Sequence, residues 1–304
     1  MPKIYSKAYF GNTIIPIEQA NLSVASSAVL YGLSVYTVFP VRPTKEGMTA
    51  FCLKEHYTRL INSAKIIGID TFEPAWSYDT FKSAVSELVH ANQLQEKAFV
   101  RATVHVSELI PGTRSRGLET KLSMFVYEAK PIMPQDGARL KTSVWRRIPD
   151  YAIPSRAKVN GAYVNSVLGK QDALDSGYDD CVFLDSSGHV CELSAGNIFL
   201  IRDGKLLTPA VSNDILEGIN RKVILEIAEQ LNLSIEERNI DLTELYIADE
   251  VFACGTSSFV APIIEIDARK IGKGVGPITL QIREKLEGLM EDESKTSKYV
   301  TLLG

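Results

Sequence analysis

The alternation of apolar and polar residues predicts four helices along the chain. In residues 54–67 the apolar side chains return every third or fourth position, and Gly68 follows where helices commonly end. Residues 78–91 predict a second helix, and residues 161–176, followed by Gly177, predict a third. A fourth begins after Gly218, because apolar residues again recur on one face there.

Shorter β-branched stretches predict strands between these helices. Residues 98–106 and 140–146 have the composition of strands. Residues 181–185 and 190–192 flank a Ser-Ser-Gly turn, and residues 198–201 and 206–207 flank an Arg-Asp-Gly turn, so each pair predicts a hairpin. Residues 250–254 predict a further strand. Strands and helices do not alternate regularly, which favours an α+β fold over a parallel α/β sheet.

A turn-rich segment divides the chain. Residues 129–137 read AKPIMPQDG, and two prolines and an Asp-Gly pair interrupt the preceding apolar run. We therefore expect a smaller N-terminal α+β domain over residues 1–128, a linker over 129–138 and a larger C-terminal domain over 139–304.

Composition narrows the function classes. Hydrophobic residues make up 45%, charged residues 23%, and the formal net charge is -4, which is typical of a globular protein without a nucleic-acid surface. We expect the arginine pairs at 114 and 116 and at 146 and 147 to lie on solvated faces. Scattered cysteines and histidines predict neither disulfides nor a metal site. The absence of a signal-like N-terminus or a long apolar run predicts a cytoplasmic protein that does not enter a membrane.

Three segments of the second half carry candidate chemistry. Glu217-Gly218 leads directly into a helix, whose free N–H groups favour an anion such as phosphate. The turn after residue 254 reads GTSS, which offers hydroxyl and N–H donors. Lys158 stands between Ala157 and Val159, where an apolar environment would favour the neutral amine that forms imines. Each segment alone is also typical of an ordinary turn or a surface lysine.

Four sequence motifs, which include these three segments, occur in the order found in one known family. The stretches AKVNGAYVNS, VCELSAGNIF, LTPAVSNDILEGINR and ADEVFACGTSS resemble those of the class IV aminotransferases, which are pyridoxal-phosphate (PLP) enzymes of fold type IV. SSAVLYG and HYTRLINSAKIIGI extend the resemblance into the first half. The resemblance implies two domains with the cofactor site between them.

The resemblance also implies roles for individual residues. Lys158 matches the catalytic lysine, which forms the imine with the cofactor and moves a proton during the reaction. The cofactor would be bound by Arg59, Tyr163, Glu192, Leu216, Ile219, Asn220 and Thr256. Among these, Glu192 would lie at the pyridine nitrogen, where a carboxylate keeps the ring protonated. The substrate would contact Tyr31, Tyr36, Arg101 and Ser257.

The motifs most resemble the branched-chain group, with two departures. Phe99 stands where that group has a tyrosine two positions before the arginine, here Arg101. The family's Val-Phe-Glu-Gly is Val-Tyr-Thr-Val here, so Thr37 replaces a glutamate and Val38 a glycine. Arg114 or Arg116 is an alternative ligand of the acceptor carboxylate.

We expect ping-pong transfer of an amino group between a branched-chain L-amino acid and 2-oxoglutarate. An (R)-selective amine or a D-amino acid aminotransferase is the alternative. Aminodeoxychorismate lyase and a non-catalytic relative are less favoured. The resemblance further implies a homodimer or higher homo-oligomer, in which Tyr31 and the loop ending at Arg116 reach the neighbouring subunit's site.

Overall fold

A seven-stranded sheet forms the framework of the first part of the computed structural model, which describes residues 2–294 and 297–304. The order across this sheet is β16-β4-β3-β5-β6-β1-β2. Its strands are β1 (Ile4–Phe10), β2 (Thr13–Pro16), β3 (Ser34–Thr44), β4 (Gly47–Phe51), β5 (Ala98–Val106), β6 (Thr120–Glu128) and β16 (Val300–Leu302). The strand predicted over residues 98–106 is confirmed as β5.

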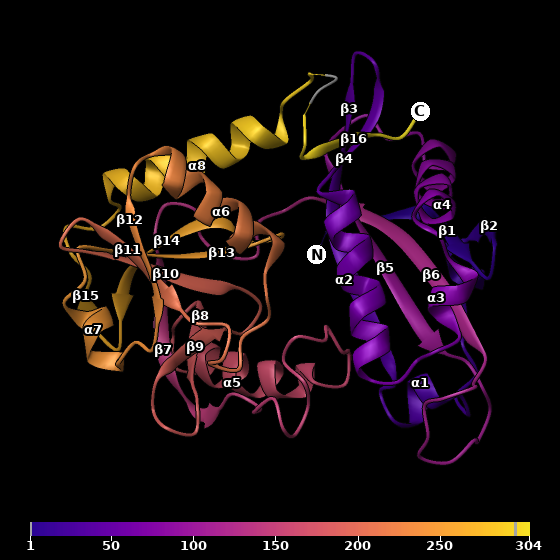
Figure 1. Ribbon diagram of the computed structural model, residues 1–304, viewed down its shortest axis with the longest axis horizontal. Helices are drawn as coiled ribbons and strands as arrows, with labels where there is room; N and C mark the ends of the chain where they lie inside the picture. Colours follow the sequence, from indigo (N-terminus) through magenta and orange to yellow (C-terminus); the bar gives the residue numbers. More distant parts are fainter. Residues whose placement is uncertain (1, 295–296) are drawn as a thin grey trace. The chain divides into compact units, whose positions relative to one another are not determined.

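Helices pack on this sheet through their apolar faces. The shorter ones are η1 (Ile17–Gln19), α1 (Ser27–Leu30) and α3 (Phe72–Ala75). The helix α2 (Leu53–Ile66) packs against β3, and α4 (Tyr78–Ala91) packs against β1 and β6 (Figure 1). The hydroxyl of Ser77 accepts a hydrogen bond from the N–H of Thr80 and so caps α4. The helices predicted over residues 54–67 and 78–91 are confirmed.

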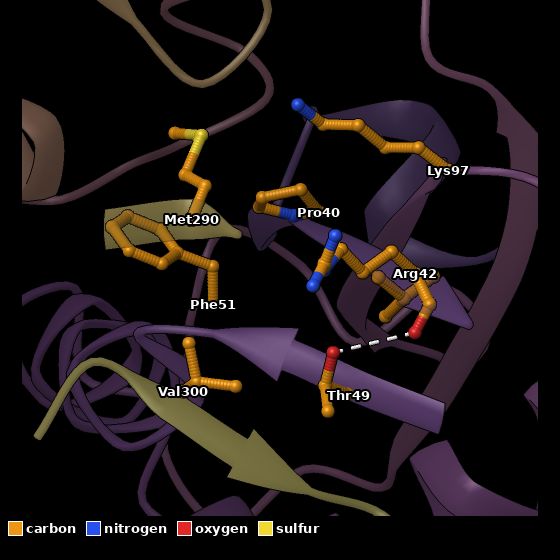
Figure 2. Close-up of a pocket in the computed structure, with 8 residues that line it drawn as sticks. Pro40, Arg42, Thr49, Phe51, Lys97, Met290 and Val300 are labelled. Atoms are coloured by element: carbon orange, nitrogen blue, oxygen red, sulfur yellow. Dashed lines mark hydrogen bonds between the residues drawn. The ribbon is translucent and has the colours of Figure 1, made fainter. Parts of the chain in front are cut away.

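The C-terminal strand completes the first sheet. β16 pairs antiparallel with β4, and Met290 and Val300 lie near Phe51 around a small hollow (Figure 2). Beside them the hydroxyl of Thr49 donates to the carbonyl oxygen of Arg42 across 3.3 Å. The hollow measures about 10 Å³, room for about one water molecule, so it is too small for an amino acid.

A nine-stranded sheet forms the second framework, in the order β12-β11-β10-β13-β14-β7-β8-β9, with β15 paired to β14. Its strands are β7 (Ala138–Arg146), β8 (Asp180–Leu184), β9 (Val190–Leu193), β10 (Asn197–Arg202), β11 (Lys205–Pro209), β12 (Ser234–Arg238), β13 (Glu250–Gly255), β14 (Phe259–Ile266) and β15 (Arg269–Lys270). The accompanying helices are α5 (Tyr163–Asp175), α6 (Ile219–Gln230), α7 (Leu242–Tyr246) and α8 (Pro277–Met290).

Local sequence explains the hairpins of this sheet. β10 and β11 are joined by Asp203 and Gly204, which have φ angles of 51° and 73°. Two residues with positive φ make the turn whose twist matches the flanking strands, and Asp-Gly is a favoured sequence for it. This predicted hairpin is therefore confirmed, and so is the other one, because β8 pairs antiparallel with β9. The third predicted helix begins at Tyr163, two residues later than predicted, and the fourth begins at Ile219 with Gly218 as its N-cap.

The chain divides into two units that are not continuous in sequence. The first unit holds Met1–Lys130, Ala157–Gly161 and Met290–Gly304, and the second holds Pro131–Arg156 and Ala162–Leu289. The first passage between them, after Lys130, falls inside the predicted linker. Unlike the predicted domains, however, the first unit also takes the segment that carries Lys158 and the C-terminal strand. Among the helices of residues 2–294 and 297–304, none is long and apolar enough to cross a membrane.

Candidate active site

Lys158 lies on a segment that pairs with the start of β3 in the first unit. The N–H of Tyr36 donates to the carbonyl oxygen of Lys158 across 3.0 Å, and the N–H of Asn160 donates to that of Ser34 across 2.9 Å. The paired positions of β4 lie at the other end of β3, from Val41 onward, so this segment lies along the opposite end of the same strand. Main-chain pairing therefore fixes the backbone of Lys158.

The side chain of Lys158 is half-buried. Its neighbours Ala157 and Val159 are buried, and its own N–H donates to the hydroxyl of Ser63 on α2 across 3.0 Å. The Nζ atom lies 4.9 Å from the centre of the Tyr36 ring, where the aromatic face attracts an ammonium group. The predicted apolar flanks of the lysine are thus present on both sides.

Two glycines let the lysine segment approach the turn before β3. A Cβ added to Gly32, whose φ is 64°, would lie 2.9 Å from the Cα of Gly161. No side chain is tolerated at such a distance, and a positive φ also disfavours one. Glycine at both positions therefore allows the backbone contact that accompanies the pairing of this segment.

Arg101 lies against the same aromatic ring. Its guanidinium carbon is 3.6 Å from the centre of the Tyr36 ring, and it donates to the side-chain oxygen of Asn160. The amide nitrogen of Asn160 donates in turn to the hydroxyl of Ser34 across 2.8 Å. On β5, Arg101 is directly opposite Val38 of β3, so Val38 borders the space beside the guanidinium. The structure thus brings Lys158, Tyr36 and Arg101 together.

The other predicted residues of the first unit are either half-buried or exposed. Arg59 is half-buried on α2 and donates to the hydroxyl of Thr37 across 3.3 Å. Tyr31 follows α1 and is 47% exposed. Arg114 and Arg116 are both exposed, as expected for a solvated loop.

Glu192 lies in β9 of the second unit and is held at both oxygens. Its Oε1 is 2.7 Å from the guanidinium of Arg147, and its Oε2 accepts hydrogen bonds from the amide of Asn197 and the N–H of Leu216. The residue is only 5% exposed. The expectation that Arg147 lies on a solvated face is wrong, because its side chain is mostly buried against this carboxylate, while Arg146 is exposed.

The two turns predicted to favour phosphate come together in the second unit. The amide of Asn220 in the first turn of α6 donates to the carbonyl oxygen of Gly255, at the end of β13, across 3.0 Å. Gly218 caps α6, and no side chain caps it. The N–H groups of the first turn and the neighbouring Thr256 therefore lie in one region, with the positive end of the helix dipole.

Three further predicted residues lie in the second unit. Tyr163 is the first residue of α5 and is half-buried. Leu216 is half-buried, and its carbonyl oxygen accepts a hydrogen bond from Asn197. The carbonyl oxygen of Ser257 accepts a hydrogen bond from the N–H of Ile132.

A family model matches most of the chain. Residues 34–266 match the family described as amino-transferase class IV. This chain belongs to the class IV aminotransferases. The match spans the segments of Arg59, Lys158 and Glu192, so the family expected from the sequence motifs is confirmed.

Individual relatives extend over nearly the full length of this aminotransferase. A probable branched-chain-amino-acid aminotransferase of Aquifex aeolicus is 37% identical, covering 91% of this chain and 90% of the relative. The crystal structure of a branched-chain aminotransferase from Thermoproteus uzoniensis with norvaline has a TM-score of 0.92 at 31% identity, covering 99% and 100%. A branched-chain amino acid aminotransferase from Thermobaculum terrenum, in its PLP form, has a TM-score of 0.90 at 29% identity, covering 99% of both chains. The fold expected from the resemblance is confirmed.

The groups in each unit fit pyridoxal phosphate. In the first unit, a primary amine on Lys158 lies over an aromatic ring, and Arg59 supplies a cation. In the second unit, Glu192 supplies a buried carboxylate, and the N-terminus of α6 has no side-chain cap hydrogen bond. These are the partners that an aldehyde, a pyridine nitrogen and a phosphate require. Within residues 2–294 and 297–304, no group of three or more His, Cys, Asp or Glu side chains is placed to hold a metal ion.

Sequence reasoning missed several residues that support the site. These are Ser63, Arg147, Asn160 and His56. Arg147 left no clear sequence signal, because it follows the last residue of β7 and the three residues before it are all exposed. The contacts of Asn160 join positions far apart in the sequence and leave no local signal.

Proposed function

We propose that this enzyme transfers an amino group between a branched-chain L-amino acid and 2-oxoglutarate by a ping-pong mechanism that uses pyridoxal phosphate. The observation that carries the proposal is the placement of Lys158 and Arg101 on the ring of Tyr36. An amine for proton transfer and a cation for a carboxylate are the two groups that a reaction between amino and oxo acids requires. The names of the relatives support the branched-chain substrate.

Several side chains would hold the cofactor. Arg59, with the N–H groups of Ile219 and Asn220 and the hydroxyl of Thr256, binds the phosphate. Glu192 holds a proton at the ring nitrogen, Tyr163 donates to the phenolic oxygen, and Leu216 packs on the ring. The bound cofactor supplies a carbonyl carbon that takes up the amino group and a ring that accepts electron density from the substrate.

Lys158 would then act as the base and acid of the reaction. Its amine removes the proton from Cα of the amino donor and delivers a proton in the reverse half-reaction. Its backbone is fixed by pairing with β3, which keeps Cα in one place while Nζ moves with the side chain. The donor leaves as a 2-oxo acid before the acceptor binds, so donor and acceptor use the same residues in turn.

Arg101 is the proposed ligand of the acceptor carboxylate. Asn160 and Tyr36 hold its guanidinium, which keeps its remaining N–H groups available for a planar carboxylate. Val38, opposite Arg101, borders this space with an apolar side chain suited to a branched aliphatic group. Tyr31 and Ser257 are proposed as further substrate contacts. An (R)-amine or D-amino acid substrate is not favoured, because the relatives reported above carry branched-chain names.

A half-reaction panel tests the proposal. The purified enzyme is loaded with pyridoxal phosphate and mixed separately with L-leucine, L-glutamate, D-alanine and (R)-1-phenylethylamine, while the visible absorbance of the bound cofactor is followed. We expect L-leucine and L-glutamate to bleach this absorbance and the other two to leave it. Rapid bleaching by D-alanine or the amine, with none by L-leucine, would overturn the substrate assignment.

We further propose that two or more copies of the chain associate. Exposed apolar side chains gather where Ser26 pairs with Leu109, and a second copy would remove them from water. They are Val24 at 81%, Val29 at 53%, Leu30 at 48%, Leu109 at 57% and Ile110 at 74% exposed. Light scattering coupled to size exclusion tests this, and a monomer would contradict it. All four cysteines are buried, which supports a cytoplasmic location, where thiols stay reduced.

A further inference from the structure

A buried threonine connects Arg59 to a buried histidine. Thr37 on β3 and His56 on α2 are both fully buried, and Arg59 lies one turn after His56 on the same helix. The hydroxyl oxygen of Thr37 is 3.3 Å from a terminal nitrogen of Arg59 and 2.7 Å from Nδ1 of His56. Thr37 therefore bonds to both side chains.

The direction of these hydrogen bonds follows from the chemistry of the groups. A guanidinium has donors only, so Arg59 donates and the oxygen of Thr37 accepts. Among the described residues, the hydroxyl proton of Thr37 has no acceptor other than Nδ1 of His56, so we assign the proton to this contact and leave Nδ1 as the acceptor. The histidine is therefore neutral, with its proton on Nε2. Burial, with Arg59 and Lys158 nearby, holds the pKa of His56 well below its usual value, which agrees with this assignment.

The second ring nitrogen of His56 makes no hydrogen bond to the described residues. Its Nε2 is buried and has no hydrogen-bond partner among the residues that the structure describes. The ring packs against Phe39 with the ring centres 5.7 Å apart. Within the described chain, the hydrogen bond that His56 accepts from Thr37 is thus its only one. This bond fixes the orientation of the Thr37 hydroxyl.

We propose that Thr37 and His56 are positioning residues that orient Arg59 toward the phosphate of the cofactor. The inference rests on the proposed function, because it assumes that Arg59 binds this phosphate. A hydroxyl whose proton is committed to His56 presents only lone pairs to Arg59 and holds one nitrogen of the planar guanidinium. A fixed position for this nitrogen limits the orientation of the guanidinium plane, whose fork of N–H donors suits phosphate oxygens.

The neutrality of this support is part of the inference. A carboxylate at position 37 would attract the guanidinium and compete with the phosphate, whereas the hydroxyl of Thr37 carries no charge. Thr37 and a neutral His56 orient the cation without compensating its charge. Neither of these two side chains therefore weakens the attraction between Arg59 and the phosphate dianion.

Cofactor affinity tests the proposal without measuring turnover. The full-length chain is stripped of cofactor, and the dissociation constants for pyridoxal phosphate and for pyridoxal, which lacks the phosphate, are measured by absorbance titration. We expect Thr37→Val to weaken pyridoxal phosphate about tenfold, a loss typical of a hydrogen bond to a charged group. Pyridoxal should bind equally to both proteins, and Thr37→Ser, which keeps the hydroxyl, should bind both ligands like the wild type.

The histidine series repeats the test if Thr37→Val does not fold. His56→Leu removes the acceptor of the threonine proton and should also weaken pyridoxal phosphate selectively. His56→Asn offers a side-chain oxygen near the position of Nδ1 and should restore the affinity. Unchanged affinity of both Thr37→Val and His56→Leu, or an equal loss for the two ligands, would overturn the proposal.

A double-mutant cycle separates this inference from the proposed function. If Thr37 acts through Arg59, adding Thr37→Val to Arg59→Ala should cause no further loss of pyridoxal phosphate affinity. A further tenfold loss would overturn the inference and leave the proposed function standing. Failure of the wild-type protein to bind pyridoxal phosphate at all would instead overturn the proposed function, and the inference with it.

Discussion

The two units hold their key side chains in different ways. In the first unit, the backbone of Lys158 is fixed by main-chain pairing with β3 and by the hydroxyl of Ser63. In the second unit, the carboxylate of Glu192 is fixed by an ion pair with Arg147 and by two neutral donors, one of them the amide of Asn197. The first unit holds its lysine by uncharged hydrogen bonds and close backbone contact, whereas the second unit holds its carboxylate mainly by an opposite charge.

The difference predicts different sensitivities. A buried ion pair gives little net stability, but removal of one partner leaves a buried charge without compensation. Main-chain pairing is indifferent to most side chains but fails when the backbones are pushed apart. The second unit should therefore respond most to changes of charge, and the first to changes of shape.

The largest effect is expected for Arg147→Met. Loss of the guanidinium removes an opposite charge from the buried carboxylate of Glu192, which costs about 3–5 kcal/mol of the free energy of unfolding. Arg146→Met is the matched control, since this neighbour is exposed, and it should change stability by less than about 0.5 kcal/mol. Denaturant unfolding of the cofactor-free proteins measures both. Equal effects of the two substitutions would remove the distinction between the units.

A smaller effect is expected for Gly32→Ala in the first unit. The added methyl group meets the Cα of Gly161 and also strains a positive φ. Gly11→Ala is the control, because Gly11 has a similar φ of 55° but no neighbour within 4 Å of the added Cβ. Strain alone costs about 1–2 kcal/mol in either variant.

The two glycine variants should therefore separate in activity. Displacement of the lysine segment by about 1 Å lowers turnover by about two orders of magnitude in Gly32→Ala, whereas Gly11→Ala keeps the wild-type rate. Steady-state kinetics of the loaded enzymes measure this. Similar turnover in both variants would show that the contact of Gly32 with Gly161 does not position Lys158.

The smallest effect concerns the pH dependence of stability. The pKa of His56 is well below its usual value in the folded chain, so the unfolded chain takes up a proton first as the pH falls below about 6.5. The contribution of the neutral histidine to the free energy of unfolding is fully present above that pH and is lost as the pH falls below it. Between about pH 7.5 and pH 5.5, the wild type should lose about 1.4 kcal/mol more than His56→Asn, as measured by urea unfolding. An identical pH profile would contradict a neutral, buried His56.

Local patterns predicted much of the secondary structure. The helix over residues 78–91 and the strand over 98–106 have the predicted bounds, because each has one strongly apolar face and clear turn residues at its ends. The Asp203-Gly204 turn was recognisable because its geometry demands those residue types. Such features depend on neighbours in the sequence.

The supports of the candidate site were not predictable in the same way. The segment of Lys158 pairs with β3, about 120 residues earlier in the chain, and the sequence of neither partner encodes that choice. The hydrogen bond from Thr37 to His56 likewise depends on how α2 packs on the sheet. Lys158 itself was identified only through the family motifs, since by local sequence it is one lysine among many.

The most direct measurement for the whole account is identification of the lysine that binds the cofactor. The enzyme is loaded with pyridoxal phosphate, reduced with borohydride and digested, and the modified peptide is found by mass spectrometry. We predict that the phosphopyridoxyl group is on Lys158, in the peptide that contains Val159 and Asn160. Modification of a different lysine in a fully active enzyme would contradict it.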